Sequence, residues 1–137
     1  MAAPIDWLTD FVSYLCTTHS AGTIGTNVFR FQYPSTFAPS SLCTVVSPIG
    51  GTAFDKGIGV DFPSVQILHR CQTVDTAWDA ANALYHRLKD AGPVRLGSAP
   101  YTLINSVRAL QVPYVIGQDE ARAWVISASY ELDLLSE

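Results

Sequence analysis

The spacing of apolar residues predicts a strand followed by a helix in the middle of the chain. Over residues 63–70, apolar side chains alternate with polar ones, which is typical of a strand. Over residues 74–88 the apolar positions recur at helical spacing, at Val74, Ala77, Trp78, Ala81, Leu84, Tyr85 and Leu88. Such a stripe must pack on a sheet, so we expect Trp78 in the core. Thr73 directly precedes the helix, and we expect it to be the N-cap residue.

The same pattern predicts a second helix and further strands. Residues 5–16 place Leu8, Phe11, Val12 and Leu15 on one helical face. Alternation predicts strands over residues 28–33, 42–47, 101–112 and 122–135, with loops over residues 48–59 and 93–100. In the last of these strands the apolar residues face one way, at Trp124, Ile126, Ala128, Tyr130, Leu132 and Leu134. We expect Pro113 to end the strand over residues 101–112. The last strand would exceed about 40 Å if straight, so it must bend at a bulge or project to pair with another molecule.

Together these elements indicate one α+β domain spanning residues 1–137, in the order α-β-β-β-α-β-β. The expected sheet is mixed and mainly antiparallel, with about five strands and two helices packed on it. Apolar residues make up 48% of the chain and charged residues 15%, which favours a folded core over disorder.

Charge and cysteine content exclude some functions. The formal net charge is −4 and the eight basic residues are scattered, whereas a general nucleic-acid binder needs clustered Lys and Arg. The first six residues lack the basic region of a signal peptide, and no apolar run is long enough to span a membrane. Three cysteines without a Cys-x-x-Cys pair indicate reduced thiols, made in a cytoplasm.

No arrangement of reactive residues predicts catalysis, a metal or a cofactor. The glycine-rich stretch 50–59 lacks the phosphate-binding motif and precedes a strand, where that motif needs a helix. His69 and Cys71 are two residues apart, and two ligands do not make a metal site. Asp119 and Glu120 are expected to be solvated or to pair with Arg122. The remaining alternative is a small ligand-binding or enzymatic domain with residues 50–59 as its binding loop.

The order and spacing of these elements resemble a phage family over residues 4–135. The resemblance rests on three parts of the chain: the leading amphipathic helix; the strand Pro63-Ser-Val-Gln-Ile-Leu-His-Arg70 with the Ala- and Leu-rich helix after it; and the ending Tyr101–Gln111, Pro113-Tyr-Val-Ile-Gly117-Gln-Asp-Glu120-Ala-Arg122 and the long strand from Trp124. These are similar to the tail terminator (tail completion) proteins of long-tailed phages and to related minor capsid or neck proteins. That family often has glycine where this chain has Ala121, which bears on the geometry of the last turn.

The resemblance implies a structural role without enzymatic activity or cofactor. It implies a homo-hexameric ring in the virion, at the neck between tail and head, that caps the head-proximal end of the tail tube and ends its polymerisation. The implied partners are the chain itself, the tail tube protein and the head-tail connector or head-completion protein. DNA would pass through the ring without sequence-specific binding. A neck or head-closure subunit bound to the connector is the alternative within this class.

For the subunit or partner interface we predict the turn before the last strand, the glycine-rich loop and the end of the last strand. The candidate residues are Gly50, Gly51, Asp55, Lys56, Gly57, Gly59, Gln118, Asp119, Glu120, Arg122, Glu131 and Asp133.

Overall fold

The computed structural model describes residues 7–34, 36–53, 60–89, 91–96 and 102–136. Within these ranges the chain forms two helices and six strands. In order they are α1 (Trp7–Thr18), β1 (Val28–Arg30), β2 (Cys43–Ala53), β3 (Val60–Cys71), α2 (Val74–Leu88), β4 (Val94–Leu96), β5 (Thr102–Gln118) and β6 (Trp124–Ser136).

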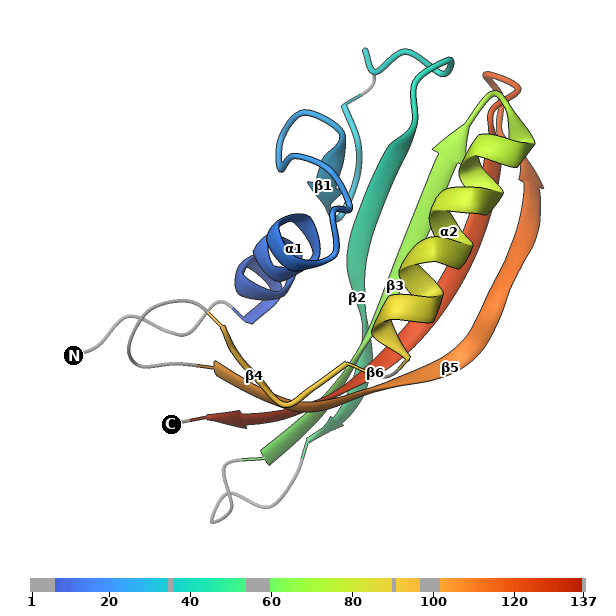
Figure 1. Cartoon of the computed structure of the whole chain (residues 1–137). Helices are drawn as coiled ribbons and strands as arrows, with labels where there is room; N and C mark the ends of the chain where they lie inside the picture. Colours follow the sequence, from blue (N-terminus) through green and yellow to red (C-terminus); the bar gives the residue numbers. More distant parts are fainter. Residues whose placement is uncertain (1–6, 35, 54–59, 90, 97–101, 137) are drawn as a thin grey trace.

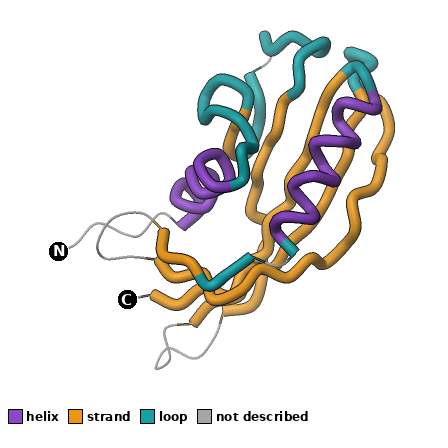
Figure 2. The backbone as a smooth tube through the Cα atoms, viewed as in Figure 1, coloured by secondary structure: helices purple, strands orange, loops and turns teal. Residues whose placement is uncertain are grey.

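One curled sheet carries both helices on the same face, which we call the inner face (Figures 1 and 2). The strand order is β1-β2-β3-β6-β5-β4, and every pairing is antiparallel except that of β1 with β2. The predicted α+β class is therefore confirmed. The sixth strand, β4, lies in the predicted loop 93–100, because three residues are too few to show a periodic pattern.

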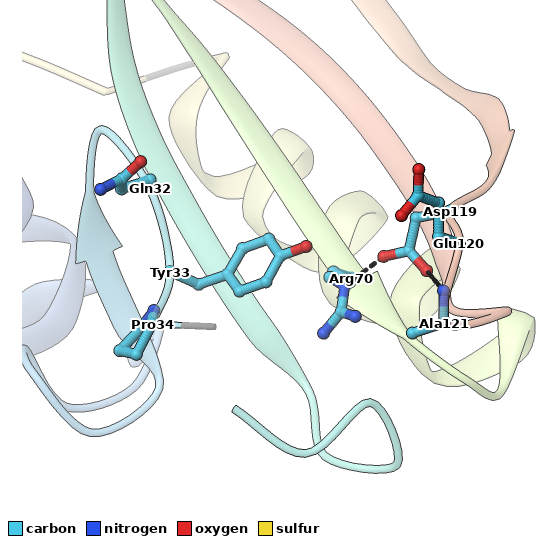
Figure 3. A pocket seen from close by; sticks show the side chains of 7 residues that line it. All are labelled: Gln32, Tyr33, Pro34, Arg70, Asp119, Glu120 and Ala121. Carbon is cyan, nitrogen blue, oxygen red and sulfur yellow. Dashed lines mark hydrogen bonds and ion pairs between the residues drawn. The ribbon is translucent and has the colours of Figure 1, made fainter. Parts of the chain in front are cut away.

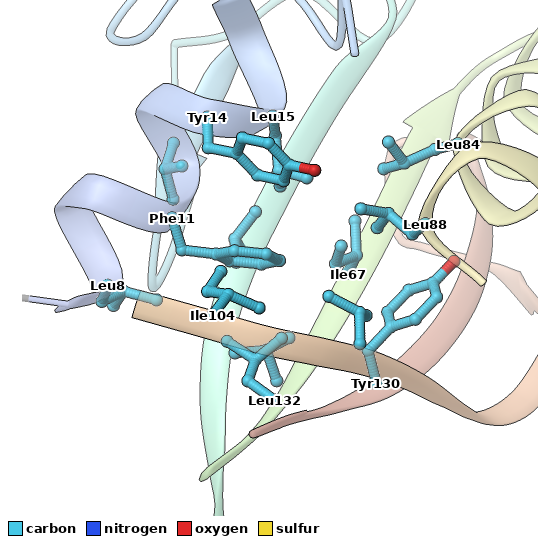
Figure 4. Packing of buried hydrophobic residues seen from close by; sticks show 14 of the residues in the cluster. Leu8, Phe11, Tyr14, Leu15, Ile67, Leu84, Leu88, Ile104, Tyr130 and Leu132 are labelled. Atoms are coloured by element: carbon cyan, nitrogen blue, oxygen red, sulfur yellow. The ribbon is translucent and has the colours of Figure 1, made fainter. Parts of the chain in front are cut away.

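The main core lies between the inner face of the sheet and the two helices. Phe11 and Leu15 of α1 are fully buried, as is Leu88 of α2, and they meet side chains from β3, β5 and β6 (Figure 4). The strand residues in this cluster include Ile67, Ile104, Ala128, Tyr130, Leu132 and Leu134. The predicted inward face of the last strand is thus confirmed, as is the predicted apolar face of α1.

Helix α2 uses a narrower apolar face than its sequence predicts. Ala77, Ala81, Leu84 and Leu88 are buried, and Ala77 and Ala81 pack with Cys71 and Ile126 on the strands. Trp78 is 38% exposed, so its predicted place in the core is wrong. The two alanines let the helix lie close to the sheet, and the larger indole is left at the rim. Thr73 occupies the N-cap position, but its side chain makes no capping hydrogen bond.

Three strands end several residues away from their predicted ends. β1 stops at Arg30, and β2 continues to Ala53 through residues expected in a loop, with an irregularity between Pro48 and Gly50. β5 continues through Pro113 to Gln118, with a shift of register between Gln111 and Tyr114. Proline is tolerated there because an edge strand or a bulge does not need its missing N–H for the ladder.

The last strand, β6, is the centre of the sheet and does not project from it. β3 pairs with it from Cys71↔Trp124 to Val60↔Leu135, and β5 pairs with it from Gln118↔Trp124 to Thr102↔Ser136. Its neighbours β3 and β5 are long enough to pair with it from end to end, so β6 itself neither contains a bulge nor projects from the sheet. The bulges lie in β5, where the register shifts four times against β6.

Truncation of Leu88 tests whether the buried face of α2 contributes more to stability than the partly exposed Trp78. Leu88→Ala removes a fully buried side chain and should lower the free energy of unfolding by about 2–5 kcal/mol, through lost burial and the cavity left behind. Trp78→Ala is the matched control on the same helix and should cost only about 1 kcal/mol, because the indole is partly exposed. Urea unfolding followed by circular dichroism measures both. Equal losses would contradict this account of the core.

Candidate interface site

The structure separates the predicted interface residues between the two ends of a long sheet. The turn containing Gln118, Asp119, Glu120 and Arg122 joins β5 to β6 at one end. Gly50 and Gly51 lie in the second half of β2, toward the end where β2 leads to β3. Four further candidates lie outside the described residues: Asp55, Lys56, Gly57 and Gly59. The candidates therefore do not form one site.

Glu131 and Asp133 lie on the face of the sheet away from the helices, which we call the outer face. Glu131 forms an ion pair with Arg108 of β5, with 2.9 Å between Oε1 and Nη2. Asp133 accepts a hydrogen bond of 3.1 Å from Nδ2 of Asn105. Gly50 lies in the same cross-strand row as Glu131, with Ser64 between them. These two carboxylates already have partners within the chain, so they hold β5 to β6 before any second molecule binds.

The turn between β5 and β6 is organised by Asp119. Its Oδ1 accepts hydrogen bonds from the backbone N–H groups of Ala121 (2.9 Å) and Ala123 (3.0 Å). The N–H of Arg122 donates to the backbone oxygen of Asp119 at 3.0 Å. Arg122 has a φ of 62°, the left-handed conformation that glycine adopts most easily. The turn thus presents an exposed arginine from a strained backbone position.

The other carboxylate oxygen of Asp119 binds a residue from a distant part of the chain. The Nε atom of Arg70, near the end of β3, lies 2.5 Å from Oδ2. Arg70 is only 5% exposed, and its Nη1 atom has no hydrogen-bond partner among the described residues. The expected pairing with Arg122 is therefore wrong for Asp119. Alternation places Arg70 on a strand, but nothing in the sequence connects it with a residue 49 positions later.

A cleft of about 730 Å³ opens beside this ion pair (Figure 3). Tyr33 and Pro34, which follow β1, form one wall, and Glu120 and Ala121 form the opposite wall. The Tyr33 ring covers the Arg70 guanidinium, with 4.4 Å between the ring centroid and Cζ, which is a cation–π distance. Gln32 completes the lining. The cleft lies between the loop after β1 and the β5–β6 turn, and Arg70 contacts both of these segments.

The electrostatics of the cleft are those of a structural ion pair. Burial works to raise the pKa of the Asp119 carboxyl, but hydrogen bonds from Arg70, Ala123 and Ala121 and the charge of Arg70 outweigh it and lower that pKa. The carboxylate therefore stays ionised at neutral pH. The carboxylate already accepts hydrogen bonds from three donors and pairs with a counter-charge, which leaves no free base for proton transfer.

His69 is a core histidine. It is 2% exposed on β3, its Nδ1 lies 3.2 Å from the hydroxyl oxygen of Thr44, and burial lowers its pKa to about 4. It borders a cavity of about 220 Å³ between α2 and the chain after α1.

In the part of the chain that the structure describes, no three His, Cys, Asp or Glu residues are grouped as metal ligands. Cys16, Cys43 and Cys71 are free thiols. No described helix is long and apolar enough to cross a membrane.

Residues 21–135 match the family described as "Bacteriophage tail terminator protein". The chain therefore belongs to the bacteriophage tail terminator family and is a structural component of the virion. It is not an enzyme, so the enzymatic alternative is wrong.

A solved structure supports the fold. One chain of "Virion of native gene transfer agent (GTA) particle" superposes with a TM-score of 0.57, covering 82% of this chain and 81% of that one at 19% sequence identity. At this identity the likeness concerns the fold alone. Among curated proteins, none matches the chain.

Replacement of Asp119 tests whether the ion pair holds the turn. Asp119→Asn keeps an acceptor at Oδ1 but removes the charge that pairs with Arg70, and it should lower the free energy of unfolding by about 2 kcal/mol at pH 7. Because the folded-state pKa of Asp119 is lowered, its stabilisation is present above the unfolded pKa of about 3.9 and is lost as pH falls through the folded value.

The measurement is urea unfolding of both proteins at pH 7 and near pH 3. The difference between the wild-type protein and the variant should shrink at low pH. His69 titrates in both proteins, so its effect cancels in the difference. A difference independent of pH would show that the carboxylate charge does not stabilise the turn.

Proposed function

We propose that this protein forms a homo-hexameric ring that caps the head-proximal end of the phage tail tube. The ring ends tube polymerisation and offers a docking surface to the head-tail connector or head-completion protein at the neck of the virion. The observation that carries this proposal is the family match over residues 21–135.

The placement of the candidate residues supports a two-sided role. The β5–β6 turn and the Gly50–Gly51 part of β2 lie toward opposite ends of the same sheet. A subunit between a tube and a connector needs a contact surface at each end, and a long, fully paired sheet holds two such surfaces at a fixed separation. The Arg70–Asp119 pair, whose arginine is buried, holds the turn in one conformation, which limits the entropy lost on binding.

Net charge supports passage of DNA without binding. Six copies at −4 each give a formal charge of −24 for the ring. Negative charge facing a central channel repels phosphates, which suits a conduit for DNA rather than a DNA-binding site. A solved ring whose channel is lined with Lys and Arg would contradict this part of the proposal.

Purified tail tubes of the same virion provide the direct test. Tube protein polymerised with increasing amounts of this protein should yield shorter tubes with a visible cap at one end in negative-stain electron microscopy. Uncapped tubes that continue to elongate would overturn the proposal. If the protein instead binds the isolated connector and leaves tubes uncapped, it is a neck or head-closure subunit.

Reversal of the Arg122 charge should impair assembly without unfolding the subunit. Arg122→Glu changes an exposed side chain in the turn, so the unfolding transition should stay close to that of the wild-type protein while the fraction of capped tubes falls at least tenfold. Arg122→Asn is the matched control, because asparagine tolerates the left-handed backbone and removes the charge without reversing it.

The Asn variant should retain more capping than the Glu variant, counted on the same tube preparation. Normal capping by Arg122→Glu would remove this arginine from the interface.

A further inference from the structure

The outer edge of β5 is open along most of its length. β4 pairs only with its first residues, from Leu96↔Thr102 to Val94↔Ile104. The N–H of Val107 then donates to the backbone oxygen of Ala91 at 3.3 Å. From Arg108 to Gln118 no described strand pairs with that side of β5, and Figure 1 shows this stretch as the rim of the sheet.

This open edge is unusually apolar. Of the nine large exposed hydrophobic residues in the described chain, five lie between positions 110 and 116: Leu110, Val112, Tyr114, Val115 and Ile116. Val112 is 63% exposed and Ile116 is 55% exposed. The sequence from Ala109 to Gln118 contains no charged residue. Edges of monomeric sheets are commonly protected by charge, so an uncharged apolar edge indicates a pairing surface.

The same sheet has a second open edge, at β2. β1 covers β2 only from Thr44 to Val46, and the N–H of Phe31 donates to the backbone oxygen of Val46 at 2.9 Å. Beyond Ser47 no described strand lies on that side of β2. The stretch Pro48–Ala53 also carries no charge, and Ile49 is exposed.

The direction of the strands makes these two edges complementary. β2 and β5 are connected through three antiparallel pairings, β2 with β3, β3 with β6 and β6 with β5. The two edge strands therefore run in opposite directions. A second copy rotated about an axis near the strand direction brings its β2 against β5 as an antiparallel neighbour.

We propose that the open edge of β5 binds the open edge of β2 in a second copy of this chain by antiparallel strand pairing. The inference rests on the proposed ring, because a contact between two different edges can repeat from copy to copy and close a ring. Pairing of β5 with its own symmetry mate would stop at two copies and leave β2 unused.

The irregularities of both edges restrict how the copies pair. Pro113 has no N–H to donate, and the register of β5 shifts on either side of it. β2 shifts between Pro48 and Gly50. Regular pairing is thus confined to short stretches, which favours one register over indiscriminate sheet extension. In the sheet, Ser47 and Gln111 share a row, so copies must be staggered along the strands for the open stretches to overlap fully.

Photo-cross-linking identifies the occupant of the edge. The full chain with p-benzoylphenylalanine in place of Val112 is prepared in unlabelled and ¹⁵N-labelled forms, which are mixed and irradiated with and without tail tubes. We expect mixed-isotope cross-links between the β5 peptide and a peptide containing residues 47–53 of another copy. Cross-links to residues 108–118 of another copy, to the tube protein alone, or to nothing would overturn the inference.

Charge placed on the edge should weaken the pairing. In this experiment p-benzoylphenylalanine replaces Ile49, and the yield of cross-links between copies is measured. The double variant Val112→Lys with Ile116→Lys should lower that yield at least tenfold. Trp78→Lys is the control, since it exchanges a partly exposed apolar residue that belongs to α2 and to neither edge strand. Thermal unfolding checks that each variant is folded, and an unchanged yield from the folded double variant would contradict the inference.

Failure of this inference is distinguishable from failure of the proposed function. Tubes that are capped without cross-links between β5 and β2 would leave the terminator role intact and refute the edge pairing. Copies that cross-link between β5 and β2 but never cap a tube would support the edge pairing and refute the terminator role.

Discussion

The fold depends on burial of the inner face of one sheet beneath two helices. β6 lies at the centre, paired on both sides, and its inward residues Ala128, Tyr130 and Leu132 meet α1 and α2 in one core. Burial of apolar surface on this scale is the main favourable term in folding. Because both helices cover the same face, neither helix covers the outer face of the sheet.

The outer face and the ends of the sheet are held by polar contacts instead. Arg70 and Asp119 connect β3 to the β5–β6 turn, and Arg108 and Glu131 connect β5 to β6. A buried ion pair contributes little net stability compared with apolar packing, but it defines geometry because leaving either charge alone is costly. The arrangement suits a subunit whose end surfaces must keep one shape before and after assembly.

Periodicity was sufficient to predict the class of fold and the faces of α1 and β6, since burial imposes a repeating pattern on long elements. It could not predict β4, which has three residues, or the continuation of β5 through Pro113, which depends on a bulge and an open edge. Trp78 was misplaced because spacing says which side of a helix is apolar, not how close neighbouring alanines bring that helix to the sheet.

The candidate site was harder to predict for a related reason. The turn 118–122 was located by its composition, but its organisation by Arg70 depends on a contact between residues far apart in the chain. The open edges were equally hidden, because whether a strand has a neighbour is decided by topology and not by its own residues. Val112 has the sequence of an ordinary strand residue, and Ile116 lies beyond the predicted end of that strand. Neither position shows in the sequence that β4 pairs only with the beginning of β5.

Separation of core from perimeter has a consequence for assembly. Side chains such as Leu88 and Tyr130 stabilise the subunit without reaching its surface, whereas Arg122, Val112 and Ile116 are exposed and contribute little to the core. An apolar edge that stays open in the free subunit risks pairing with any strand. Pro113 and the bulges of β5 limit that risk, since they break the regular ladder that unspecific sheet extension requires. The edge can therefore remain apolar enough to pair while rejecting partners whose own strand does not match its irregular shape.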